Sequence, residues 1–146
     1  MVSCQSWDTR MGDPYAKHEK KLSGPFAQAL KDNAAFREWV LTRTKFDAFA
    51  SEAMLLDEEM MARRSMDSAN WWVSHHRGGC DCFGCKGGKE TDLLAIFGVD
   101  NLRFALHFEF KNPKDSFKIE NRQPEAYRLR AECWVGNPPK AVVPQS

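Results

Sequence analysis

The sequence predicts an α/β fold in a single domain. Three observations predict it: apolar residues at helical spacing before residue 64, strict alternation over residues 102–111, and a helical segment with an early proline at residues 123–134. A chain of 146 residues suits one domain. At this size a chain can bury roughly 68–70% of its unfolded surface, so the core needs no disulfides. We expect the globular domain to span residues 23–135.

The N-terminal part is expected to be irregular at first and then helical. We expect residues 1–22 to lack regular structure and a helix to begin at Ser23-Gly24-Pro25, because proline suits the first helical position. A break is predicted at Asp32-Asn33, and a further helix from Phe46 to Arg64. That helix would present one apolar face, formed by Phe49, Ala53, Leu56 and Met60.

The second half is expected to hold the strands. Residues 70–76 form a short strand candidate, and Thr91–Phe97 and Leu102–Lys111 form two further strands of a hairpin. Gln123–Trp134 then forms the last helix, and residues 136–146 form a tail.

Composition and charge argue against several classes of protein. The chain has a net charge of +1, a polar N-terminus and no run of 18 apolar residues, so a polycation, a secreted precursor and a membrane protein are not expected. Three of the five cysteines fall within residues 80–85, which indicates metal binding in a reducing compartment such as the cytoplasm. Acidic residues concentrate in segments 47–62 and 90–110, which suits a cation bound beside a polyanion.

The strand at residues 102–111 and its neighbour present a candidate for chemistry. Alternation places Glu109 and Lys111 on one face, opposite the core face formed by Phe104, Leu106, Phe108 and Phe110. Asp92 falls on the face of Glu109 in either of two turn registers, which pair it with Glu109 or with His107. Two carboxylates this close repel each other unless a cation intervenes, and Mg²⁺ or Mn²⁺ prefers such oxygens. The alternative is a solvated strand end with a salt bridge.

These residues resemble a known family. Asp92, Glu109-x-Lys111 and Gln123-x-x-x-Tyr127 follow one another as in the PD-(D/E)xK nuclease superfamily, in its branch with a QxxxY motif. The resemblance covers residues 90–134 well, although Thr91 stands where the family name has proline. It implies a restriction-endonuclease-like fold, in which helices flank a mixed central sheet (an αβββα core), here with an N-terminal helical extension. It also implies metal-dependent hydrolysis of DNA phosphodiester bonds.

The resemblance implies a role for each matching residue. Asp92 and Glu109 would bind Mg²⁺, Lys111 would be the catalytic lysine, and Gln123 and Tyr127 would lie beside the site. Arg128 and Arg130 would contact phosphates. A further metal-binding Glu often comes from the helix before the sheet, and both Glu52 and Glu59 fit that place.

A second candidate site lies in the glycine-rich loop at residues 77–89. His75, His76, Cys80, Cys82 and Cys85 are ligand types that favour Zn²⁺ in a closed, structural site. The fourth ligand stays open between one of the histidines, Cys4 and Cys133. Iron–sulfur members of the nuclease branch place three cysteines after the last helix motif, whereas this chain has only Cys133 there, which argues against such a cluster.

Two functions therefore compete. The first is a Mg²⁺-dependent nuclease that acts on DNA and carries a structural zinc loop. The second is a non-catalytic zinc module that binds nucleic acid or a protein on the same scaffold. A hydrolase acting on another substrate is a third reading, because a fold does not fix a function. No membrane partner is expected, and a homo-oligomer or a larger complex stays open, as does the choice between DNA and RNA.

Overall fold

The structure is a computed structural model that describes residues 14–63, 70–73, 75–76, 80–86, 90–111 and 122–136. For residues 14–20, His76 and Glu90 it describes the backbone only. In chain order the elements are α2 (Pro14–Asp32), α3 (Ala34–Leu41), η1 (Asp47–Phe49), β1 (Met54–Leu55), α4 (Asp57–Ala62), β2 (His75–His76), β3 (Glu90–Thr91), β4 (Leu93–Val99), β5 (Leu102–Phe108) and α5 (Gln123–Gly136).

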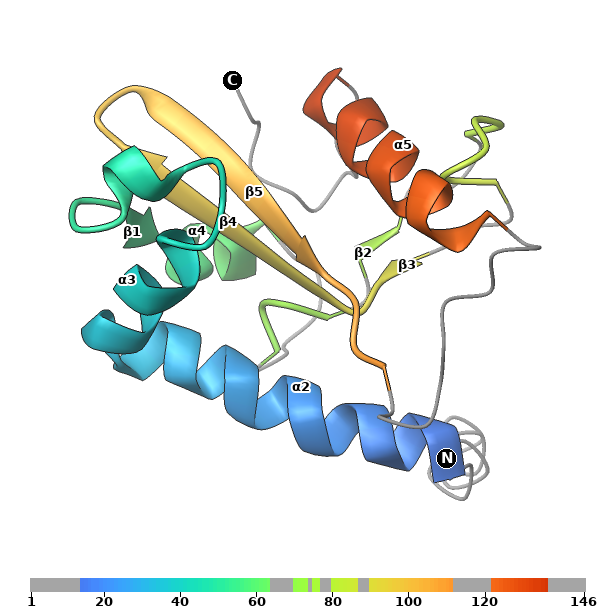
Figure 1. The fold of residues 1–146 in the computed structure, drawn as a ribbon, viewed down its shortest axis with the longest axis horizontal. Helices are drawn as coiled ribbons and strands as arrows, with labels where there is room; N and C mark the ends of the chain where they lie inside the picture. The colour runs from blue at the N-terminus through green and yellow to red at the C-terminus, as the bar shows by residue number, and fades with distance from the viewer. Residues whose placement is uncertain are drawn as a thin grey trace.

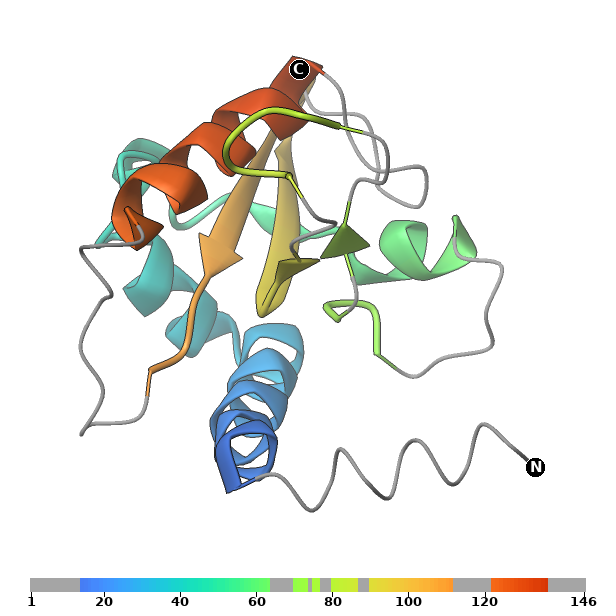
Figure 2. The ribbon, with the colours of Figure 1, turned by 90° about the vertical axis from the view of Figure 1, so that its right-hand side faces the viewer.

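Helices cover both faces of a small antiparallel sheet, which confirms the α/β class (Figures 1 and 2). The sheet has the strand order β1-β4-β5, and β2 and β3 form a separate two-stranded ladder. All strand pairs among the described residues are antiparallel, so the mixed sheet expected from the family resemblance is not found in this part of the chain. No helix of the described residues combines the length and the apolar character needed to cross a bilayer.

The hairpin of β4 and β5 follows the two-residue turn register. Val99 pairs with Leu102, and Leu93 pairs with Phe108 at the other end. Asp100 in the turn has a φ of 50°, a left-handed conformation that Asp tolerates better than most residues. Residues 93–97 of β4 are all fully buried, as expected for a strand covered on both faces.

The two faces of β5 pack as the alternation predicts. On one face, Phe104 stacks on Phe46 at a ring-centroid distance of 4.1 Å, and Phe108 contacts Phe26 of α2 at 4.9 Å. On the other face, the ring of His107 lies 5.0 Å from that of Trp134 in α5. The helices α2 and α5 therefore lie on opposite sides of the hairpin, and α5 covers the face that carries Glu109 (Figure 2).

The predicted start of the first helix is wrong. Helix α2 begins at Pro14 and runs through Pro25. Residues 16–22 are mostly Ala, Lys, Glu and Leu, which favour helix and extend it upstream of the second proline. The predicted break is confirmed, because the side chain of Asn33 accepts a hydrogen bond from the Phe36 N–H and caps α3.

The single helix predicted from Phe46 to Arg64 is also wrong. This segment divides into η1, β1 and the short α4. The backbone of β1 pairs with β4 at Leu55 and Phe97, and the Leu56 N–H donates to the Ile96 carbonyl at 2.8 Å. A helix here would leave those buried groups of β4 without partners, which is costlier than giving up helical hydrogen bonds.

Other boundaries shift by a few residues. The strand predicted at residues 70–76 is reduced to β2, because Trp71 and Trp72 lie in a turn whose Trp72 carbonyl accepts the Leu94 N–H. The last helix is confirmed and extends to Gly136. The predictions for residues 1–13 and 137–146 lie outside the described residues.

Candidate functional site

Asp92 and Glu109 meet at the open end of the β4–β5 hairpin. Asp92 immediately precedes β4 and Glu109 immediately follows β5, so the strand register brings them opposite each other. The Phe110 N–H donates to Asp92 Oδ2 at 2.8 Å and fixes that carboxylate. The structure therefore brings the two predicted carboxylates together.

Arg130 contributes a cation to this pair. Its Nη2 lies 3.1 Å from Glu109 Oε1, and its guanidinium carbon lies 5.4 Å from the centre of the Tyr127 ring. The Arg130 side chain is 2% exposed, and that of Glu109 is 15% exposed. Arg130 was expected to contact phosphates, but it is buried beneath α5 and holds Glu109 instead.

Burial and a neighbouring carboxylate act together on the pKa of Glu109. Burial and the charge of Asp92 raise the pKa of Glu109 to about 8, although Arg130 and Lys111 act in the opposite direction. Lys111, two residues after Glu109, contributes the smallest of these effects on the pKa of Glu109. At neutral pH the pair keeps a proton that a divalent cation could replace.

The two glutamates proposed from the helix before the sheet do not join this site. Glu59 forms an ion pair with Arg103 at 2.8 Å, and Glu52 is exposed in the turn before β1. Arg103 and β1 both pair with Gly98, six residues along β4 from Asp92, which corresponds to about 20 Å. Both glutamates therefore lie at the wrong end of the hairpin to bind a metal with Asp92.

Helix α5 places the remaining motif residues. Gln123, Tyr127 and Arg130 follow one another at spacings of four and three, so they share one side of the helix. Gln123 is half-buried in the first turn, and Tyr127 reaches the site through the Arg130 guanidinium. Arg128 is exposed and pairs with Glu132 at 2.6 Å.

His107 is held neutral beneath α5. Its Nδ1 lies 3.0 Å from the Thr91 hydroxyl. Burial, aided by the charge of Arg130, lowers the pKa of His107 to about 3. A neutral imidazole at this position adds no charge to the carboxylate pair.

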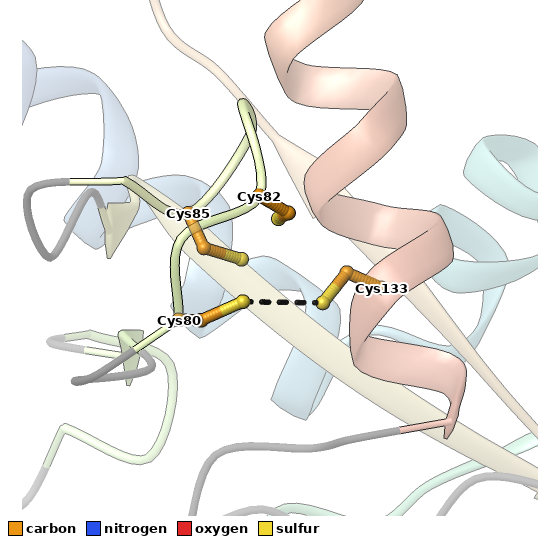
Figure 3. Close-up of side chains that lie close together, drawn as sticks. All are labelled: Cys80, Cys82, Cys85 and Cys133. Atoms are coloured by element: carbon orange, nitrogen blue, oxygen red, sulfur yellow. Dashed lines mark hydrogen bonds between the residues drawn. The ribbon is translucent and has the colours of Figure 1, made fainter.

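Four cysteines form a second cluster, the four-cysteine site: Cys80, Cys82, Cys85 and Cys133 (Figure 3). Their Sγ atoms all lie within 4.8 Å of one another, and the Cys80 and Cys133 sulfurs are 3.7 Å apart. With Zn–S bonds of about 2.3 Å, a tetrahedral site has sulfur–sulfur edges of about 3.8 Å. The arrangement is compatible with one structural zinc ion.

The fourth ligand position belongs to Cys133 and not to His75. Cys133 comes from α5 and faces the three loop cysteines (Figure 3). His75 is buried in β2 opposite Thr91, and its Nε2 lies 2.8 Å from the Trp71 carbonyl. Strand pairing therefore turns this imidazole away from the cysteines. The side chain of His76, and Cys4, lie outside what the structure describes.

The thiols of this site differ in their readiness to ionise. A hydrogen bond from the Cys82 backbone lowers the pKa of Cys80 to about 7, whereas burial raises the pKa of Cys85 to about 12. Burial also raises the pKa of Cys133. Thiolates at the buried positions require a cation beside them, which a zinc ion would supply on binding as the protons leave.

The cysteine loop lies directly on the backbone of α5. A Cβ atom on Gly84 would lie 2.3 Å from the backbone nitrogen of Arg130 and 2.6 Å from the carbonyl oxygen of Ala126. Only glycine permits this approach. The loop is therefore docked on the helical turn that carries Arg130.

A groove of about 630 Å³ follows β5 between residues 44–46 and α5. Basic side chains of Lys45, Arg103 and Arg128 line it, together with aromatic rings such as those of Phe46 and Tyr127. His107 also lines the groove, two residues from Glu109. The lining also includes Glu132, which pairs with Arg128, and it does not include Asp92 or Glu109.

No family model, curated protein or solved structure matches this chain.

Proposed function

We propose that the protein is a metal-dependent nuclease that hydrolyses DNA phosphodiester bonds and carries a structural zinc site. The observation that carries the proposal is the convergence of Asp92 and Glu109, with Lys111 beside them, at the open end of one hairpin. The choice of DNA comes from the PD-(D/E)xK resemblance, in which these positions hold the metal and the catalytic lysine.

The residues of the chain divide the work as follows. Asp92, fixed by the Phe110 N–H, and Glu109 would hold Mg²⁺ or Mn²⁺. The bound ion would polarise a phosphoryl oxygen and lower the pKa of a water. Lys111 would orient the attacking water and stabilise the charge that develops on the phosphate. Tyr127 would steady Arg130 and, through it, Glu109.

The groove beside β5 supports a nucleic-acid substrate. Lys45, Arg103 and Arg128 suit a phosphate backbone, although Glu59 and Glu132 pair with the two arginines in the structure and a polyanion would have to compete with them. The groove includes His107, two residues before Glu109, so a strand bound there would extend beyond the groove to present a phosphate to the carboxylates.

One observation favours the second candidate, a zinc module that binds nucleic acid without cleaving it. Arg130 already supplies a buried cation to Glu109, which lowers the demand of the pair for a metal. In that case the carboxylates serve to anchor α5, and the groove serves binding alone.

A cleavage assay separates the two candidates. Purified protein is incubated with single-stranded and duplex DNA, either with Mg²⁺ or with a chelator that removes Mg²⁺ but leaves zinc bound. The nuclease proposal predicts Mg²⁺-dependent cleavage that Glu109→Gln and Lys111→Ala abolish. The control variant Glu52→Gln, at an exposed position at the other end of the hairpin, should retain it. Salt-sensitive binding without cleavage would support the zinc module. Cleavage that persists in both site variants would refute the assignment of the site.

A further inference from the structure

We infer that Arg130 is a positioning residue for Glu109. Metal binding at the four-cysteine site fixes the position of Arg130, so zinc occupancy and the Arg130–Glu109 contact are coupled. This inference rests on the zinc part of the proposed function and not on DNA cleavage. It assigns to the zinc site a specific task, which is to hold one side chain against one carboxylate.

The first step is the burial of Arg130. A guanidinium that is 2% exposed requires a nearby negative charge, and Glu109 lies 3.1 Å away. The Tyr127 ring, one turn earlier on α5, packs against the guanidinium. The contact therefore exists only when α5 holds its observed place over β5.

The second step is the attachment of α5 to the cysteine loop. Cys133 lies three residues after Arg130, within one helical turn, and its sulfur is 3.7 Å from that of Cys80. On the preceding turn, Gly84 approaches the backbone of Arg130 more closely than any other residue type could. The loop therefore contacts α5 at the turn before Arg130, through Gly84, and at the turn after it, through Cys133.

The third step is the weakness of the other anchors. The fully buried side chains of α5 are Ala126, Arg130 and Trp134, so the stripe contains one large apolar side chain and one charge. Such a stripe gains little from burial compared with an apolar one. The position of the helix therefore rests on Trp134 and on the metal-thiolate link together.

Coupling of this kind is reciprocal. If zinc seats Arg130 on Glu109, then loss of the Glu109 acceptor must weaken zinc binding. Arg130→Met in the same chain also removes the buried charge that Glu109 offsets, and we expect it to restore the zinc affinity.

The test measures zinc affinity of the full chain by competition with a chromogenic chelator. We expect Glu109→Ala to weaken zinc binding about tenfold, and the Glu109→Ala/Arg130→Met double variant to return within about threefold of the wild type. Glu52→Ala makes the same change at an exposed glutamate at the other end of the hairpin, and Val40→Ala destabilises the core beneath α3; both should leave the affinity unchanged. Equal zinc affinity in Glu109→Ala and the wild type would overturn the inference.

A second measurement observes Arg130 directly. In ¹⁵N spectra, a buried and paired guanidinium gives slowly exchanging side-chain signals, assigned here by their loss in Arg130→Met. We expect these signals in the zinc-loaded protein and their loss after zinc removal, while the amides of β4 and β5 stay protected. Persistence of the signals without zinc would refute the coupling even if the variants fold poorly. A protein that shows the coupling but cleaves no DNA would refute the nuclease proposal alone.

Discussion

Asp92 and Glu109 occupy facing positions one residue beyond the paired ends of β4 and β5, and burial together with the charge of Asp92 raises the pKa of Glu109. The hairpin thus brings two like charges together in a half-buried place, where Arg130 and Lys111 only partly offset them. Folded proteins tolerate two carboxylates this close when a bound proton or metal ion offsets their repulsion.

The first prediction concerns the pH dependence of stability without divalent metal. The folded-state pKa of Glu109 is about 8, above its unfolded value of 4.5. Its contribution to stability is therefore complete below pH 4.5 and is lost as the pH rises through 8, with a slope of up to about 1.4 kcal/mol per pH unit. Chemical denaturation at several pH values should show this slope in the wild type and not in Glu109→Gln. Identical pH profiles for the two proteins would contradict the role assigned to the pair.

The second prediction concerns His107 at acid pH. Its pKa is lowered from 6.5 to about 3, so the imidazole contributes stability above pH 6.5 that is lost as the pH falls through 3. His107→Asn keeps a polar group near the Thr91 hydroxyl and removes the titration. We expect the free energy of unfolding of this variant to fall less steeply below pH 6 than that of the wild type. Equal slopes of the free energy of unfolding below pH 6 for the two proteins would show that the fold does not hold His107 in its neutral form.

The third prediction concerns Gly84. A methyl group at this position would meet the α5 backbone, which cannot give way as a flexible side chain could. Gly84→Ala should cost about 1–3 kcal/mol of stability and weaken zinc binding. Gly24→Ala is the matched control, because nothing lies within 4 Å of the added methyl in α2. Denaturant unfolding and zinc titration check both variants, and equal behaviour of the two would mean that the loop does not rest on α5.

The fourth prediction concerns the identity of the zinc ligands. We expect one zinc per chain, retained in Cys133→His, which keeps a ligand, and lost in Cys133→Ser. His75→Gln should keep the zinc, because the structure turns His75 towards the Trp71 carbonyl. Elemental analysis of the purified variants measures the metal content. Zinc loss in His75→Gln together with zinc retention in Cys133→Ser would restore the histidine as the fourth ligand.

The hairpin and the carboxylate pair were predictable from sequence because alternation is strict there. Alternation over residues 102–111 leaves Glu109 and Lys111 on the face opposite the apolar residues, and both turn registers considered keep Asp92 with them. The last helix was equally clear. These features depend on neighbours in sequence, which local patterns record well.

Features that depend on distant partners could not be predicted in the same way. Spacings of three and four at residues 49–60 indicate a helix. In the structure, Leu55 instead pairs with β4 as part of an edge strand, and the Leu56 N–H donates to a β4 carbonyl. A charged residue on a helix indicates a surface position, so the burial of Arg130 was missed. Its spacing from Tyr127 on one side of α5 was the available signal. Cys133 was one of several options because nothing local links it to a loop about 50 residues earlier.

The central claim is that two distinct metal sites lie on either side of Arg130. Crystals grown with zinc and soaked in Mn²⁺ should show zinc anomalous scattering at the four cysteines and manganese anomalous scattering between Asp92 and Glu109. Manganese bound elsewhere, or an Arg130 guanidinium that alone fills the space between the carboxylates at saturating Mn²⁺, would contradict the account.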